Sequence, residues 1–149
     1  MKNTIYYSIL GAFGVVGGAI ASALGGFDMV LKILVSLMAI DYFTGVVIAA
    51  VWQKSPKTVN GALESHHSIK GLFRKMGMLL CVYICVMLDA VTGSDYIRNT
   101  AIMFFIGNEG ISVMENLGVM GVNYPPFIKN AFEVLRDHTK DVKVETDKK

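Results

Sequence analysis

The polar residues that could do chemistry lie together in an otherwise apolar stretch, residues 108–116, which read Asn-Glu-Gly-Ile-Ser-Val-Met-Glu-Asn. On a helix, spacings of three and four residues bring side chains to one face. Four of these residues lie at such spacings and so share a face: Asn108, Ser112, Glu115 and Asn116. Glu109 lies at the border of that face. Such a polar stripe can contact another helix or water, but it cannot face lipid. Packing within one subunit and self-association around a wet lumen both satisfy it.

The two carboxylates of this stretch also raise the question of catalysis. Neither a nucleophile nor an oxyanion site accompanies them, so the sequence predicts that the protein is not an enzyme. The adjacent His66 and His67, and the pair Cys81 and Cys85, lack the companions of a ligand set. No metal and no cofactor are expected.

Asp41 is the other charged residue that needs an explanation, because it is the only charge in the apolar segment 33–52. A charge inside a membrane is costly, so it marks either a structural contact or a functional path. Two interpretations are open for Asp41. In the first, Asp41 has a structural role, with a hydrogen bond to another helix or a place in a water-filled depression. In the second, Asp41 lines a pore or triggers its opening.

The composition indicates a membrane protein. The 149 residues are 53% hydrophobic and 17% charged, with a mean hydropathy of +0.49, whereas soluble domains carry about 25% charged residues. Residues 3–27 form a run of 25 residues without Asp, Glu, Lys or Arg. A helix of that length spans about 37 Å, more than the roughly 30 Å hydrocarbon core of a bilayer. This argues against a soluble enzyme, a secreted disulfide scaffold and a disordered chain. The net charge of +2 gives nucleic-acid binding no electrostatic support.

The expected fold class is all-α, an integral membrane protein with a bundle of about four transmembrane helices. The predicted spans lie within one domain, residues 1–126, and cover residues 5–24, 33–52, 76–91 and 97–122. A cleaved signal peptide is the less favoured interpretation of the first span, because its apolar stretch is longer than a usual signal core. Residues 127–149 are predicted to form a charged cytoplasmic tail that could include a short surface helix from Phe127 to His138.

Basic residues predict the orientation, because Lys and Arg gather in the cytoplasmic loops of membrane proteins. Twelve of the fourteen basic residues lie in the N-terminal segment, the central loop 53–75 and the tail, and only Lys32 and Arg98 lie elsewhere. We therefore expect a multi-pass protein with both termini in the cytoplasm. Three residues form the cytoplasmic basic loop directly before the third span: Lys70, Arg74 and Lys75.

Small residues in the first span are candidates for helix packing. Gly14, Gly18 and Ser22 repeat every four residues, and such small-xxx-small faces allow close contact between membrane helices. This face serves either packing within the subunit or oligomerisation. Gly45 in the second span is a further packing candidate.

Three segments carry a family resemblance. Residues 41–45 read Asp-Tyr-Phe-Thr-Gly, residues 68–75 form a basic segment with Ser, Gly and Lys, and residues 108–116 are followed by Gly118 to Gly121 and by Pro125-Pro126. These segments resemble the Asp-x-x-x-Gly motif, the basic loop and the Asn-Glu-x-x-Ser-x-x-Glu-Asn segment of the toxin-secretion/phage-lysis holins. That family occurs in bacteriophages of Gram-positive bacteria and beside clostridial toxin genes. The resemblance covers residues 31–135, and the adjacent prolines and the Gly-rich first span depart from the family pattern.

The resemblance implies a non-enzymatic phage holin in the cytoplasmic membrane of a bacterial host. Such a protein oligomerises and forms a timed lesion that lets endolysin, or a toxin, cross, which leads to host lysis. The implied partners are the lipid bilayer, other copies of the chain and an antiholin, while endolysin or toxin would pass without stable binding. Three alternatives stay open: an antiholin regulator, a small ion channel or transporter subunit, and a membrane scaffold.

Overall fold

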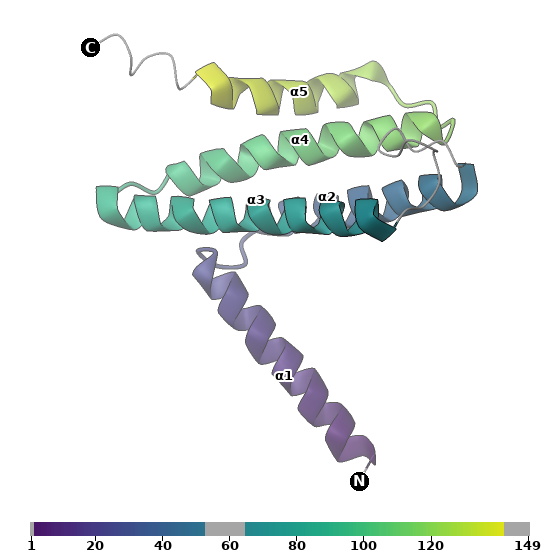
Figure 1. Cartoon of the computed structure of the whole chain (residues 1–149). Helices are drawn as coiled ribbons and strands as arrows, with labels where there is room; N and C mark the ends of the chain where they lie inside the picture. Colours follow the sequence, from purple (N-terminus) through teal and green to yellow (C-terminus); the bar gives the residue numbers. More distant parts are fainter. Residues whose placement is uncertain (1, 53–64, 142–149) are drawn as a thin grey trace.

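The computed structural model describes residues 2–52 and 65–141, and the regular structure within them is entirely helical. The helices are α1 (Lys2–Ala23), α2 (Met29–Val47), α3 (Ser65–Thr92), α4 (Ile97–Val119) and α5 (Pro126–Asp141), and a short π-helix, η1 (Ile48–Trp52), continues α2. Figure 1 shows α2, α3 and α4 side by side, with α5 antiparallel to α4 along its outer side. The predicted all-α fold class is confirmed.

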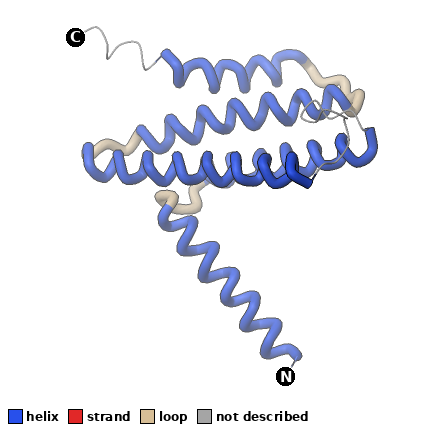
Figure 2. The backbone as a smooth tube through the Cα atoms, in the orientation of Figure 1, coloured by secondary structure: helices blue, strands red, loops and turns tan. Residues whose placement is uncertain are grey.

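Glycine and proline set the ends of several helices. At the end of α1, Gly26 has a φ of 101° and its N–H donates to the carbonyl of Ala21 at 2.9 Å, the arrangement of a Schellman cap. Asp28 then begins α2, because its carboxylate accepts a hydrogen bond from the N–H of Leu31 at 2.9 Å. Pro126 opens α5, where a missing N–H costs nothing. The resulting connections are the short loops of Figure 2.

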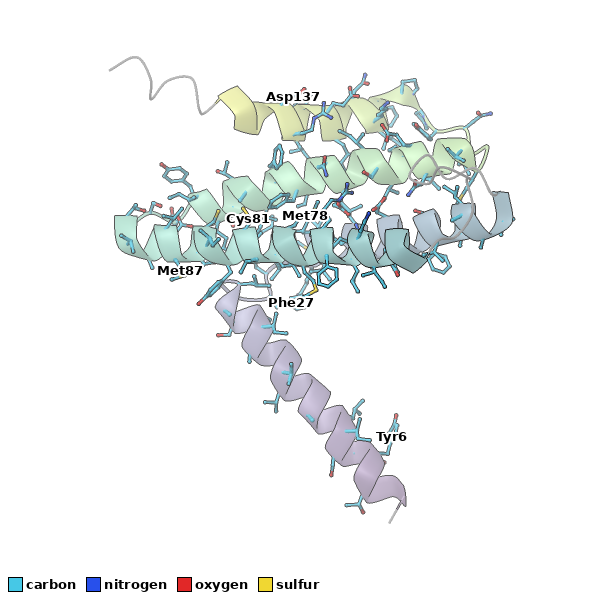
Figure 3. The ribbon with its side chains drawn as sticks, viewed as in Figure 1. Tyr6, Phe27, Met78, Cys81, Met87 and Asp137 are labelled. Carbon is cyan, nitrogen blue, oxygen red and sulfur yellow. The ribbon has the colours of Figure 1, made fainter. Side chains whose placement is uncertain are left out.

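The apolar core lies where α2, α3 and α4 meet. Its residues recur at spacings of three and four, which place them on one face of each helix. The central members are Leu31, Leu34, Met38, Met78, Val82, Ile102 and Ile106. In Figure 3, Met78 lies on the side of α3 that faces α4. Helix α4 packs against α2, α3 and α5 and is therefore the central helix of the group.

Three of the described helices are long and apolar enough to cross a membrane. The candidate spans are Tyr6–Ala23, Met29–Val51 and Ile69–Thr92. They agree with the first three predicted spans, although the third is longer than the predicted 76–91. Helix α4 covers the fourth predicted span, 97–122, but is not among the candidates found by length and composition. Its charged residues lower its mean hydropathy.

The predicted basic loop is wrong where the structure describes it. Helix α3 begins at Ser65, so Lys70, Arg74 and Lys75 are helical. The segment 65–75 contains no proline, and its Lys, Arg and Leu residues favour a helix. The earlier part of that loop, residues 53–64, lies outside the described residues.

Helix α1 stands apart from the other helices, whereas the sequence predicted a bundle of about four. Figure 1 shows it projecting away from α2 and α3. Among the described residues, a Cβ atom at Gly14 or Gly18 would have no neighbour within 4 Å, and Ser22 is exposed. The small-residue face of α1 therefore does not pack against the described part of this chain.

Candidate functional site

Lys75 of α3 lies between carboxylates of the two neighbouring helices. Its Nζ is 2.8 Å from Oδ2 of Asp41 on α2, and it also pairs with Oε2 of Glu109 on α4. The exposed fractions of the Lys75, Asp41 and Glu109 side chains are 9%, 3% and 0%. Buried charged side chains thus join the three helices α2, α3 and α4.

Asn116 extends this arrangement toward the end of α4. Its Nδ2 donates to Oδ1 of Asp41 at 3.0 Å and to Oγ1 of Thr44 at 2.9 Å. The Thr44 hydroxyl in turn donates to the carbonyl of Ile40 at 2.8 Å. We call this set of residues the Lys75 cluster: Asp41, Thr44, Lys75, Glu109 and Asn116. Gly45 lies beside it, since a Cβ atom there would be 4.0 Å from Nδ2 of Asn116.

The Lys75 cluster continues the apolar core along the helices. Lys75 precedes the buried Met78 by three residues, and Asp41 follows the buried Met38 by three. Glu109 follows the buried Ile106 at the same spacing. Because residues three or four apart share a helix face, the core side chains direct all three charges inward.

The polar groups of the cluster are not all satisfied. Oε1 of Glu109 is buried and has no hydrogen-bond partner among the residues that the structure describes, although most buried polar atoms in proteins do have one. Two carboxylates also share the Lys75 ammonium. The cluster therefore fixes which faces of the three helices meet while it is closed, and the burial of its charges is costly. If the helices separated, it would present two carboxylates, an ammonium and an amide to water.

A second polar contact, at the other end of these helices, joins the start of α4 to the connection between α1 and α2. Nη1 of Arg98 on α4 is 2.7 Å from Oδ2 of Asp28, and its Nε donates to the carbonyl of Leu24 at 2.6 Å. The hydrogen bond from Arg98 lowers the pKa of Asp28 below its ordinary value, despite partial desolvation of the carboxyl. Gly25 is required beside it, because a Cβ atom there would lie 2.7 Å from Nε of Arg98.

The structure brings together only some of the residues singled out in the sequence. Asp41, Glu109 and Asn116 meet in the Lys75 cluster. Asn108 and Ser112 are half-buried and Glu115 is exposed. The face of α4 that meets α2 and α3 is therefore rotated from the predicted one, with Glu109 at its centre rather than at its border.

Sequence reasoning missed the role of Lys75. The sequence pattern predicts a loop for it, together with Lys70 and Arg74, both of which are exposed. The signal was present in the spacing, because Lys75, Met78, Val82 and Cys85 recur every three or four residues and all four are buried. A charged residue at such a position predicts a buried partner of opposite charge.

The chain is similar to a known protein family and to several individual proteins. Residues 18–137 match the Bacteriophage holin family. An uncharacterized protein of Listeria innocua is 30% identical over 149 residues, which cover 99% of this chain and 98% of the relative. An uncharacterized protein of Listeria monocytogenes is 33% identical over 121 residues, or 79% and 81% of the two chains. A probable holin of Bacillus phage phi105 is 30% identical over 118 residues, or 78% and 81%.

No solved structure matches the chain. The family match spans α2, α3, α4 and most of α5, and so includes every residue of the Lys75 cluster. The predicted resemblance to holins is confirmed, and the chain belongs to the bacteriophage holin family.

Proposed function

We propose that this protein is a holin that assembles with copies of itself in the cytoplasmic membrane and opens a lesion through which an endolysin, or a toxin, crosses. The family match over residues 18–137 carries the proposal. The three candidate membrane spans support it, and so does the relative named a probable holin. An antiholin, if one exists for this system, would act by joining the same assembly.

We assign α4 as a fourth membrane helix. Its hydropathy understates its fit to the membrane, because Arg98 and Glu109 are buried against the rest of the chain. Only Glu115 exposes a charge within this helix. With four spans, the distribution of Lys and Arg favours both termini on the cytoplasmic side.

The Lys75 cluster supplies a physical basis for a timed transition. While a single chain is surrounded by lipid, the cluster must stay closed, because exposing its charges to hydrocarbon is costly. In an assembly that encloses water, the same side chains can be hydrated, and the cost of opening falls. The transition then favours many copies acting together over single chains opening alone.

The first test is induced expression in a bacterium that carries a cytoplasmic endolysin without an export signal. We expect a sudden drop in optical density that requires the endolysin and is hastened by an uncoupler. Potassium leakage without lysis would instead indicate a small ion path. Normal growth without leakage would overturn the proposal in favour of an antiholin or a scaffold.

A matched pair of substitutions tests the role of the Lys75 cluster. Glu109→Gln removes a buried charge that pairs with Lys75, so we expect it to shift the onset of lysis. Glu115→Gln makes the same chemical change at an exposed position of the same helix, and we expect wild-type timing. Wild-type timing in both variants would remove the cluster from the mechanism while leaving the holin function intact.

A further inference from the structure

Helix α5 lies on α4 at a distance that only glycine permits. A Cβ atom at Gly107 would be 2.7 Å from the backbone N of Arg136 and 2.7 Å from the carbonyl O of Phe132. A Cβ atom at Gly110 would overlap the Phe132 ring, with Cγ at 2.5 Å. We call Gly107 and Gly110 the glycine seam. Because both are buried, the seam is occupied by α5 along the face of α4 that α2 and α3 leave open.

The other side of α5 is charged. Lys129 pairs with Glu133 at 4.0 Å, and Arg136, whose backbone lies against Gly107, extends its side chain to Asp137 at 3.1 Å, with these side chains partly exposed. Figure 3 shows Asp137 on the outer side of α5. The helix has 16 residues and a length of about 24 Å, shorter than a bilayer core. It is therefore an amphipathic helix and not a membrane span.

These two faces favour different positions of α5 once α4 is in a membrane. Seated on the glycine seam, α5 gains close packing but holds charged side chains at membrane depth, which is unfavourable. Lying on the membrane surface, it keeps its charges in water and its apolar face in the interface. The connection 120–125, in which Gly121 with a φ of 83° ends α4, is the segment that would have to change in such a movement. An element with two such competing positions can act as a switch.

We propose that α5 is a removable cover of the glycine seam. In the dispersed chain it occupies the seam and withholds this face of α4 from other copies. Its release to the membrane surface frees the seam for close contact with a helix of a second copy, and this step precedes the lesion. The inference rests on the proposed holin function and adds to it the element that restrains assembly.

A disulfide that holds α5 in place tests the proposal directly. The Cβ position of Gly110 is 2.5 Å from Cγ of Phe132, so cysteines at these two positions have Cβ atoms close enough to bridge. Gly110→Cys with Phe132→Cys is made in a chain whose Cys81 and Cys85 are replaced by Ala. Crosslinking by diamide is followed as a mobility change on non-reducing gels. We expect the crosslinked chain to withhold lysis until dithiothreitol is added.

Single-cysteine variants treated in the same way are the matched controls. Gly110→Cys alone also displaces α5 and should lyse early, but the timing of neither single variant should change with oxidant. On-time lysis by the crosslinked chain would overturn the proposal, and so would failure of the pair to crosslink. Absence of endolysin-dependent lysis from the cysteine-free parent and the wild type would instead overturn the holin function. The two failures are therefore distinguishable.

A second variant acts in the opposite direction. Gly110→Ala places a methyl group against the Phe132 ring and displaces α5, so we expect earlier onset of lysis than in the wild type. Gly118→Ala is the control on the same helix, because its methyl group would meet Tyr124 at an ordinary 3.8 Å. A purely structural defect would delay or abolish lysis. Unchanged or delayed lysis in Gly110→Ala would contradict a restraining role for α5.

Discussion

Lys75 contacts the carboxylates of both Asp41 and Glu109 and so links three helices. Bringing charges out of water is expensive, and the mutual attraction of a buried pair only partly offsets that expense. Removing one partner therefore costs much more stability than the intact pair contributes, because it leaves a buried charge without compensation. The Lys75 cluster is better understood as specifying which faces of α2, α3 and α4 meet than as a net source of stability.

Lys75→Met should lower the free energy of unfolding by about 3–5 kcal/mol, because it leaves two buried carboxylates without their shared cation. The measurement is thermal or denaturant unfolding of the protein in detergent micelles. Lys70→Met is the matched control, since Lys70 is exposed on the same helix and should change stability by no more than about 0.5 kcal/mol. Equal effects of the two substitutions would show that Lys75 is not paired in the folded protein.

At the scale of elements, Arg98 fastens the α1–α2 connection to the start of α4. It binds the Asp28 carboxylate and the carbonyls of Leu24 and Gly26. Asp28 also caps α2, so one carboxylate serves a helix end and an ion pair. Asp89, near the end of α3, joins that helix to the start of α4, because its carboxylate accepts hydrogen bonds from the backbone N–H groups of Ile97 and Arg98. The ends of α2, α3 and α4 are therefore joined by side chains as well as by the chain.

This contact predicts a pH dependence. The hydrogen bond from Arg98 lowers the pKa of Asp28 in the folded state, so the folded protein binds fewer protons there than the unfolded chain. The stabilisation is therefore present above the ordinary pKa of Asp and is lost as the pH falls through that value toward the lower folded-state pKa. We expect the unfolding temperature in micelles to decrease below about pH 4.

Asp28→Asn is the control for this prediction. Asparagine retains the capping oxygen of α2 but cannot carry the negative charge that pairs with Arg98. The variant should be less stable than the wild type near neutral pH, and the difference should shrink as the solution is acidified. A difference that stays constant with pH would show that the ion pair does not contribute.

At the scale of the whole molecule, the chain divides into a packed group of four helices and a separate α1. The large apolar side chains of α1 that the structure describes, from Tyr6 to Ile20, are exposed, and Tyr6 lies far from the packed helices in Figure 3. The family match begins at residue 18, near the end of α1. Helix α1 is thus available to lipid or to other copies, while α2 to α5 hold their arrangement through the core and the Lys75 cluster.

Deleting residues 2–20 should therefore leave the unfolding midpoint of the remaining chain in detergent micelles unchanged. The deletion retains Leu24, whose side chain belongs to the core and whose carbonyl binds Arg98. Circular dichroism during heating is a suitable measurement, with the full chain in the same detergent as the reference. A large decrease in the midpoint would mean that α1 packs against the other helices in the folded protein.

Residue types and their local spacing are enough to predict the class of the molecule. Long apolar runs require helices in a membrane, because only internal hydrogen bonds satisfy the backbone there, and the polar residues that interrupt them mark where helices must face one another. Asp41, Glu109 and Asn116 were identified in this way, and the Asn-Glu-x-x-Ser-x-x-Glu-Asn segment indicated the family. These features depend on residue type and local spacing, which a single chain displays in full.

Which of these residues meet depends instead on how the helices pack. Lys75 lies 34 residues from both Asp41 and Glu109, and no local pattern specifies such pairing. The rotation of α4 places Glu109 inside and Glu115 outside, and it follows from the packing of Ile102 and Ile106 against the other helices. The packing of α5 on Gly107 and Gly110 also depends on tertiary structure. The sequence shows a glycine inside a helix but does not show which neighbouring element needs the space that a side chain would fill.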